Sequence, residues 1–324
     1  MTYRWTAFAL VLFACQSKPA PPPPPENGSG SGSGSGSATE PGNQVVYADL
    51  PDPDVKLPMQ TAFDIVDAGT GDKAPLRYAP AAEMRSYLAA TALKTRRLAN
   101  KEWSPLTTTP TVTTGLALIP STNGTFTGRG LPAEGPADNA DAKAMMAAWK
   151  VFGDRRIALP VDDRGQAGLP SFADNPNAAT PAALDDLVQR DLLTFVPVPA
   201  DPIGVGASWR VVTVLRQGPF IVKQTALYKL AARTKTAWTV HVDIQRVGET
   251  QPVKDASVPP NTAVQLVLLV RHYSGALTID PTHAMGDGAL KVDSSLHLRY
   301  SSPTMPMVEE MVEDQGTITL SSKL

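Results

Sequence analysis

The clearest pattern along the chain is a strict alternation of apolar and polar residues in its C-terminal half. Between residues 235 and 247, tryptophan, valine and isoleucine occupy every second position from Trp238 to Ile244, and polar residues lie between them. The same alternation occurs at 290–300 and at 316–324. A period of two is typical of a strand with one buried and one solvated face. These segments therefore predict strands of an antiparallel sheet that packs one face and exposes the other.

Further strands are predicted from apolar, β-branched runs that are bounded by turn residues. These runs are 111–119, 125–129, 208–215, 220–230, 263–272 and 276–280. The pair Asn123-Gly124, between the first two, is a favoured hairpin turn. The segment 84–98 favours a helix by its alanine and leucine content and a strand by the even spacing of its tyrosine and threonines. We interpret this segment as a strand.

Two helices are predicted in addition to the strands. Residues 138–152 begin with acidic residues and place Met145 and Trp149 on one apolar stripe. Residues 182–193 follow a Thr-Pro pair that suits the N-cap and first helical positions. The expected fold class is α+β: a β-rich domain with a large curved antiparallel sheet, half-barrel-like, packed with about two helices.

Composition narrows the possible classes of protein. Of 324 residues, 42% are hydrophobic, so a sizeable core can form and wholesale disorder is excluded. The formal net charge of −2 provides no field that would attract nucleic acid, and we expect no nucleic-acid partner. One cysteine excludes an intrachain disulfide and a zinc site built from several cysteines.

That single cysteine, Cys15, follows Arg4 and the apolar run 5–14, which is too short to span a bilayer as a helix. The segment 12–15 resembles the lipobox of bacterial lipoproteins, although Phe13 occupies a slot that usually holds a smaller residue. The resemblance implies that residues 1–15 are a signal peptide and that Cys15 is lipidated by a diacylglyceryl thioether. An ordinary signal peptide that contains a cysteine, or an uncleaved anchor, is the alternative.

A tether is predicted after the cysteine. Five consecutive prolines at 21–25 form a stiff extended stretch, and the Gly/Ser run 28–37 is a flexible coil. We therefore expect 16–42 to be disordered and 43–324 to fold as a single β-rich domain, either as one unit or as two halves that share a sheet.

A family resemblance rests on the run 195–209, in which a proline-rich segment leads into a glycine-flanked strand start with Trp209. This run resembles a signature of uncharacterised bacterial exported lipoproteins. The resemblance extends loosely over 75–324 and includes a helix followed by a β segment with an acidic-glycine turn at 155–165. It names no reaction.

Residues that could carry chemistry are few. Those considered are the pair His241 and Asp243, His297, His272, His283, the acid pairs Asp162-Asp163 and Asp185-Asp186, and the Gly286-Asp287-Gly288 turn. We interpret them as solvated strand faces, turns and a helix surface, because none shows the spacing of a catalytic or metal-binding motif. No catalytic residue, metal or cofactor is predicted. Five large apolar residues are expected in a core or a cleft: Met145, Trp149, Trp209, Trp238 and Leu266.

Three function classes follow. The leading one is a membrane-tethered envelope lipoprotein that acts as a non-catalytic binding or interaction module. The first alternative is a carrier or sensor of an apolar ligand in a half-barrel cleft, and the second is a hydrolase with dispersed active-site residues. Gln16 directly after Cys15 resembles lipoproteins sent to the outer membrane, so we expect a lipid anchor there. The expected partners are the membrane and an envelope protein or an apolar small molecule.

Overall fold

A computed structural model of the protein describes residues 59–99, 102–121, 124–153, 155–168, 171–172, 195–217, 219–253, 261–283, 285–303 and 305–323. The predicted signal peptide, Cys15, the tether 16–42 and the helix predicted at 182–193 lie outside the described residues.

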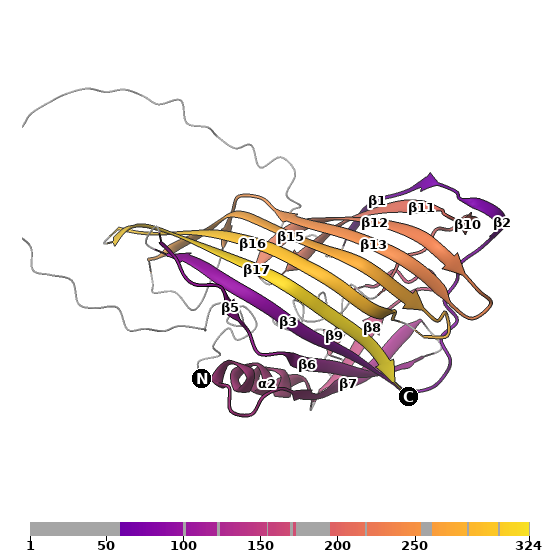
Figure 1. Ribbon diagram of the computed structural model, residues 1–324, viewed down its shortest axis with the longest axis horizontal. Coiled ribbons are helices and arrows are strands. Elements are labelled where there is room, and N and C mark those ends of the chain that lie inside the picture. The colour runs from indigo at the N-terminus through magenta and orange to yellow at the C-terminus, as the bar shows by residue number, and fades with distance from the viewer. Residues whose placement is uncertain are drawn as a thin grey trace, which may run out of the picture.

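The described part of the chain is mainly β. A large antiparallel sheet of 15 strands has the order β1-β11-β12-β13-β15-β16-β17-β3-β6-β7-β8-β9, with β14 beside β15 and the short β4 and β5 beside β3. Figure 1 shows this path from β1 and β11 through β17 and β3 to β8. A separate pair joins β10 to β2. The strand bounds are β1 (Met59–Asp67), β2 (Thr70–Ala74), β3 (Arg85–Ala99), β4 (Glu102–Trp103), β5 (Thr107–Thr108), β6 (Val112–Pro120), β7 (Thr125–Glu134), β8 (Arg156–Pro160), β9 (Ser171–Phe172), β10 (Ile203–Val205), β11 (Ser208–Gln217), β12 (Phe220–Arg233), β13 (Trp238–Gly248), β14 (Gln251–Val253), β15 (Ala263–Ile279), β16 (Asp287–Ser302) and β17 (Met305–Lys323).

The strands predicted from alternation are confirmed, and the interpretation of 84–98 as a strand is confirmed by β3. Two predictions are corrected in detail. The segments 263–272 and 276–280 belong to one continuous strand, β15, because Ser274 and Gly275 stay paired with both neighbouring strands. The last strand, β17, is much longer than its predicted part and begins at Met305.

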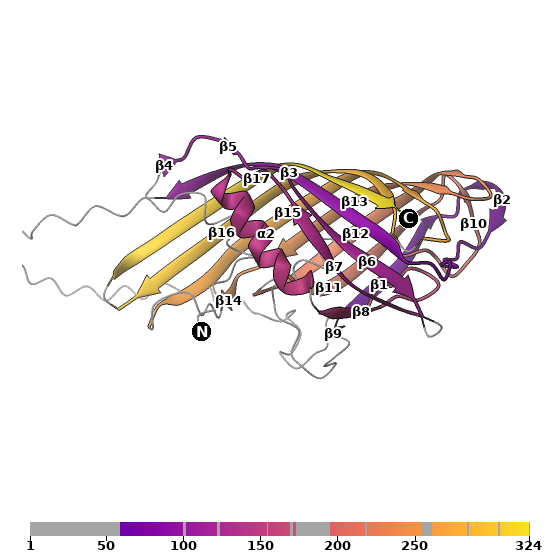
Figure 2. The ribbon, with the colours of Figure 1, turned by 90° about the horizontal axis from the view of Figure 1, so that it is seen from below.

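One helix, α2 (Ala140–Gly153), lies in the described residues, where 138–152 was predicted. Its N-cap is Asn139, whose side-chain oxygen accepts hydrogen bonds from the backbone N–H groups of Asp141 and Ala142 at 2.9 and 3.0 Å. The helix lies against β7 and β6 (Figure 2). The indole of Trp149 is buried and donates a hydrogen bond to the carbonyl of Leu131 on β7, which fixes the helix to the sheet.

The predicted α+β class is therefore too rich in helix for the part of the chain that the structure describes. This part is mainly β, because the long antiparallel strands satisfy each other's backbone groups and a single helix covers part of one face. No helix among the described residues is long and apolar enough to cross a membrane.

Buried side chains form three apolar clusters. The central cluster is built around strands β11 to β17 and includes Trp209, Tyr228, Ile244, Tyr273 and Val292. The distal cluster lies farther along the same strands and includes Leu215, Phe220, Val222, Leu266, Leu296 and Val312. The helix-side cluster includes Leu116, Leu118, Phe126, Trp149 and Ile157. Among the five residues that the sequence assigned to a core or cleft, the three tryptophans and Leu266 are buried, and Met145 is half-buried.

The proline-rich run that begins at Phe195 packs on the central cluster. The carbonyl of Val196 accepts a hydrogen bond from the buried Tyr78 hydroxyl at 3.1 Å, and the carbonyl of Pro197 accepts one from the Trp209 indole at 2.7 Å. The Trp209 ring stacks on Tyr228, with 5.6 Å between the ring centroids. These hydrogen bonds join the proline-rich run to Tyr78 and to β11, the strand that contains Trp209.

Candidate functional site

A row of polar residues crosses the face of the sheet that carries the central and distal clusters. Each member is directly paired with the next across neighbouring strands. The row therefore takes one residue from each strand of the sheet from β1 to β3, both included, in the order in which the strands lie side by side. Because directly paired residues point to the same side of a sheet, all these side chains share one face. In strand order, the polar row consists of Gln60, Thr213, Gln224, Arg246, Arg271, Ser294, Asp314 and Thr95.

The polar row divides the apolar residues of this face. On β11, Val211 of the central cluster and Leu215 of the distal cluster lie on either side of Thr213. On β16, Val292 and Leu296 lie on either side of Ser294 in the same way. The sheet face is thus apolar, then polar, then apolar along its strands.

Arg246, on β13, is the most deeply buried charged residue of the polar row, with 2% of its surface exposed. Its Nε donates a hydrogen bond to Oε1 of Gln224 at 2.8 Å, and its guanidinium carbon lies 5.4 Å from the centre of the Tyr273 ring. A neighbouring amide oxygen and an aromatic face both stabilise a guanidinium group away from water.

Farther along the polar row, next to its last member Thr95, Asp314 on β17 is 4% exposed. Burial raises the pKa of its carboxyl above the ordinary value, although the hydrogen bond from the Thr95 hydroxyl at 2.8 Å and the charges of Arg271 and Arg97 act in the opposite direction. Arg97 itself forms an ion pair with Glu310 at 3.0 Å. Burial therefore favours the protonated form of Asp314.

A cleft of about 250 Å³ opens at the β1 to β13 part of the polar row. Four members of the row line it, together with apolar residues of the sheet and apolar residues from segments outside the strands. The full lining is Gln60, Gly165, Gln166, Ala167, Phe195, Pro197, Val211, Thr213, Leu215, Gln224, Tyr228, Ile244 and Arg246. The cleft thus has an apolar floor with a polar strip at Thr213, Gln224 and Arg246.

The wall that faces the sheet is a tight loop after β8. Asp162 accepts hydrogen bonds from the backbone N–H groups of Arg164 and Gln166 at 2.9 and 2.8 Å, and Gly165 adopts a φ of +73°. A side chain at Gly165 would meet the Tyr78 ring and the carbonyl of Val196, so only glycine fits this turn.

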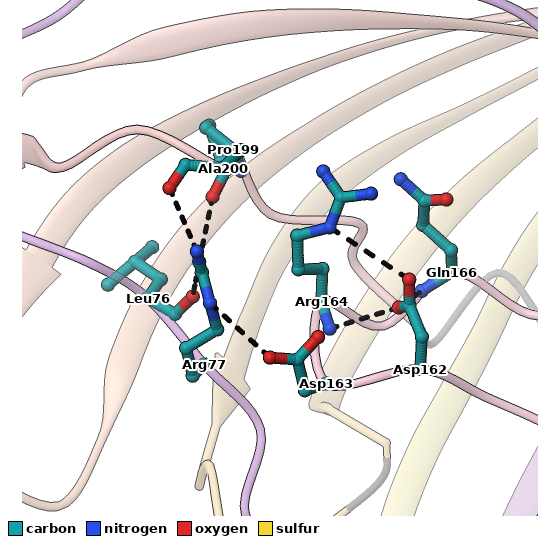
Figure 3. A network of polar contacts seen from close by, with 8 residues as sticks. All are labelled: Leu76, Arg77, Asp162, Asp163, Arg164, Gln166, Pro199 and Ala200. Atoms are coloured by element: carbon teal, nitrogen blue, oxygen red, sulfur yellow. Dashed lines mark hydrogen bonds and ion pairs between the residues drawn. The ribbon is translucent and has the colours of Figure 1, made fainter. Parts of the chain in front are cut away.

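Arg77 holds this loop in place (Figure 3). Its guanidinium donates to the carbonyls of Pro199 and Ala200 at 3.0 and 2.8 Å, and its Nε lies 3.5 Å from Oδ2 of Asp163. Two backbone hydrogen bonds, from Tyr78 to Asp163 and from Val198 to Arg164, add to this connection at 2.8 Å each. The loop and the proline-rich run therefore form one rigid wall of the cleft.

The histidines named in the sequence analysis lie on the face of the sheet opposite the polar row, or in a turn. His241 and Asp243 share a face as expected, but Asp243 pairs with His272 of β15, at 3.2 Å. His297 pairs with Glu309 of β17 at 3.4 Å, and His283 with Asp280 at 3.6 Å. None of these residues lines the cleft. Within the described ranges, no three His, Cys, Asp or Glu residues are close enough to hold a metal ion.

The acidic pairs and the glycine turn singled out in the sequence have three different outcomes in the structure. Asp162 and Asp163 cap and anchor the cleft loop, in agreement with their interpretation as a turn. The pair at 185–186 lies outside the described residues. The interpretation of Gly286-Asp287-Gly288 as a turn is wrong in part, because Asp287 and Gly288 are the first residues of β16 and pair with β15. The turn lies before them, where Asp280 accepts hydrogen bonds from the backbone and hydroxyl of Thr282 at 2.8 and 2.6 Å.

Sequence reasoning missed the polar row, although β13 carries a signal for it. Arg246 follows Trp238, Val240, Val242 and Ile244 at the same spacing of two, so it occupies a position where the pattern requires an apolar residue. A charged residue at an inward position is rarely buried unless a partner or a function requires it.

A comparison of the chain with models of protein families gives no match, and neither does a comparison with curated protein sequences.

Proposed function

We propose that this chain is a non-catalytic binding module of the bacterial envelope, which holds the apolar part of a small ligand in the cleft over the polar row. The observation that carries the proposal is the cleft itself, in which apolar side chains surround a short polar strip of Thr213, Gln224 and Arg246. Sites for small molecules are typically apolar, with a few placed polar groups that fix orientation.

A half-barrel-like curvature of the sheet belongs to this proposal. What supports it is the origin of the cleft lining. Gln166 and Ala167 follow β8, near one end of the strand order, whereas Val211 and Thr213 are on β11, near the other end. A sheet that brings residues from both ends to one cleft encloses a ligand between its own face and the loop after β8.

The volume of the cleft limits the ligand. At about 250 Å³ it lies below the roughly 300–1,000 Å³ that is usual for sites of drug-sized molecules. We therefore propose that it takes a small molecule or one end of a longer one, such as part of an alkyl chain beside Val211, Leu215 and Ile244.

The place of action rests on the N-terminal sequence. Cys15 within its lipobox-like segment and the tether 16–42 support a lipid-anchored protein, and Gln16 supports the outer membrane as its destination. The family of exported lipoproteins that the run 195–209 resembles is consistent with this location. A hydrolase is not proposed, because none of the described histidines lines the cleft.

The test is native mass spectrometry of the full chain with Cys15→Ser, expressed in the periplasm and followed by extraction of any bound molecule. Thr213→Phe fills the cleft, and Thr225→Phe is the matched control, since it adds the same ring on the next strand and on the opposite face. We expect a co-purifying mass that Thr213→Phe removes and Thr225→Phe retains. A chain that carries no ligand in any variant contradicts the proposal.

A further inference from the structure

We infer that the ligand of this cleft is an anionic amphiphile, whose acidic group binds beside Arg246 while its alkyl chain lies against the apolar side chains of the cleft. The inference rests on the proposed binding function and names the chemical class of the ligand.

The first support is the position of Arg246. Its side chain is 98% removed from solvent and yet lines the cleft, so a bound ligand meets a cation in a place of low water content. Charges attract each other more strongly there than at a solvated surface. The planar guanidinium is also the side chain best shaped for a carboxylate or phosphate group.

The second support is the charge of the polar row. It contains two arginines, Arg246 and Arg271, which are directly opposite each other, and one acidic residue, Asp314. Asp314 lies beyond Ser294, at the β17 end of the row, whereas the cleft is at the β1 to β13 end. The cleft end of the row is therefore its positive end.

The third support is the arrangement of apolar groups around the charge. Along the strands, Ile244 lies next to Arg246, and Tyr228 and Val211 line the cleft on the central-cluster side of the row. Leu215 lines it on the distal side. An alkyl chain that enters beside the guanidinium therefore meets apolar surface within the same cleft.

The experiment measures the binding of three C10 probes to the full chain with Cys15→Ser by titration calorimetry, below their micellar concentrations. Decanoate and decyl phosphate carry the two acidic groups, and decanol is the neutral control. At neutral pH the carboxylic acid is ionised, since the pKa of such a carboxyl is about 4–5. Arg246→Gln removes the cation, and Arg210→Gln, on the exposed face of β11, is the matched control.

We expect at least one acidic probe to bind about ten- to a hundredfold more tightly than decanol. Arg246→Gln should abolish this preference, Arg246→Lys should keep part of it, and Arg210→Gln should leave it unchanged. The tighter of the two acidic probes identifies the head group. If Arg246→Gln does not fold, the comparison of decanoate and decyl phosphate with decanol, made on the chain that keeps Arg246, still tests the inference.

Equal affinity for decanol and both acidic probes would overturn the inference and leave the proposed binding function standing. A preference for acidic probes that persists in Arg246→Gln would overturn the assignment to this residue. If no probe binds, the inference fails, and the co-purification experiment with Thr213→Phe decides separately on the proposed function.

Discussion

Arg246 and Arg271 are directly opposite each other on β13 and β15, and both lie on the apolar face of the sheet. Like charges in directly opposite positions destabilise a sheet. Arg271 donates a hydrogen bond to the hydroxyl of Ser294 at 3.3 Å, and the next residue of the row, Asp314, is an acid. Asp314 is the one acidic residue of the row. The row therefore carries a negative charge only when this buried carboxyl, whose pKa is raised, is ionised.

The first prediction concerns Asp314 and pH. Because burial raises the pKa of Asp314 in the folded state, the folded chain holds a proton that the unfolded chain releases above about pH 4. The contribution of this group to stability is complete below the unfolded pKa and is lost as pH rises through the folded pKa. We expect Asp314→Asn, which cannot titrate, to gain stability relative to the natural chain as pH increases from about 4 to 8.

Urea unfolding followed by tryptophan fluorescence at several pH values measures this difference. Asp293→Asn, on the solvent face of the neighbouring β16, is the control for loss of a carboxylate. If the stability of Asp314→Asn instead falls relative to that of the natural chain as pH rises, the carboxyl is stabilised in its charged form and the prediction is wrong.

The second prediction concerns the proline-rich run. Trp209→Phe removes the indole N–H that donates to Pro197 at 2.7 Å. Trp238→Phe removes a similar volume from a residue whose indole makes no hydrogen bond within the described part of the chain, and it is the matched control. We expect Trp209→Phe to lower the free energy of unfolding by about 1–2 kcal/mol more than the control. Equal losses in urea unfolding would mean that the hydrogen bond contributes nothing.

The third prediction concerns the close approach of β10 and β2. A methyl group at Gly204 would overlap the backbone carbonyl of Thr70, which is fixed by the pairing of these strands. We expect Gly204→Ala to destabilise the fold by about 1–3 kcal/mol in thermal or urea unfolding.

Gly153→Ala is the control for this substitution. At the end of α2, a methyl group would lie 3.9 Å from its nearest neighbour, the carbonyl of Gly130, so space is available. Alanine also favours a helix over glycine by up to about 1 kcal/mol. A similar loss of stability in both variants would argue against the steric explanation at Gly204.

The fourth prediction concerns the lipid anchor. If Cys15 is the acylated residue, Cys15→Ser leaves the chain without its membrane-binding chains, and we expect it to move from the membrane to the soluble fraction of the envelope. Fractionation with immunodetection measures the distribution, and Ser17→Cys in the Cys15→Ser background shows whether a cysteine outside the lipobox-like segment restores attachment. Unchanged membrane association of Cys15→Ser would disprove lipid anchoring through this residue.

The long strands could be predicted from sequence because alternation is a local property. Consecutive side chains of a strand point to opposite faces, so 235–247 and 290–300 reveal both their conformation and their buried face. The strand β1 carries no such clear pattern, because it pairs only with β11 and its residues are mostly exposed. Its place in the sheet depends on the partner strand.

The local pattern of residues is sufficient to predict a β-rich folded part, strands that bury one face, and the helix near Trp149. The alignment of polar residues from separate strands depends on how the strands pair in the folded sheet. In β15, an irregularity between Leu266 and Leu268 shifts the alternation, so that Arg271 takes the inward position and His272 faces outward to Asp243. Register depends on bulges and on pairing across the whole sheet, and a one-residue shift reverses every side chain that follows it. For this reason the polar row and the cleft over it could not be predicted from the sequence.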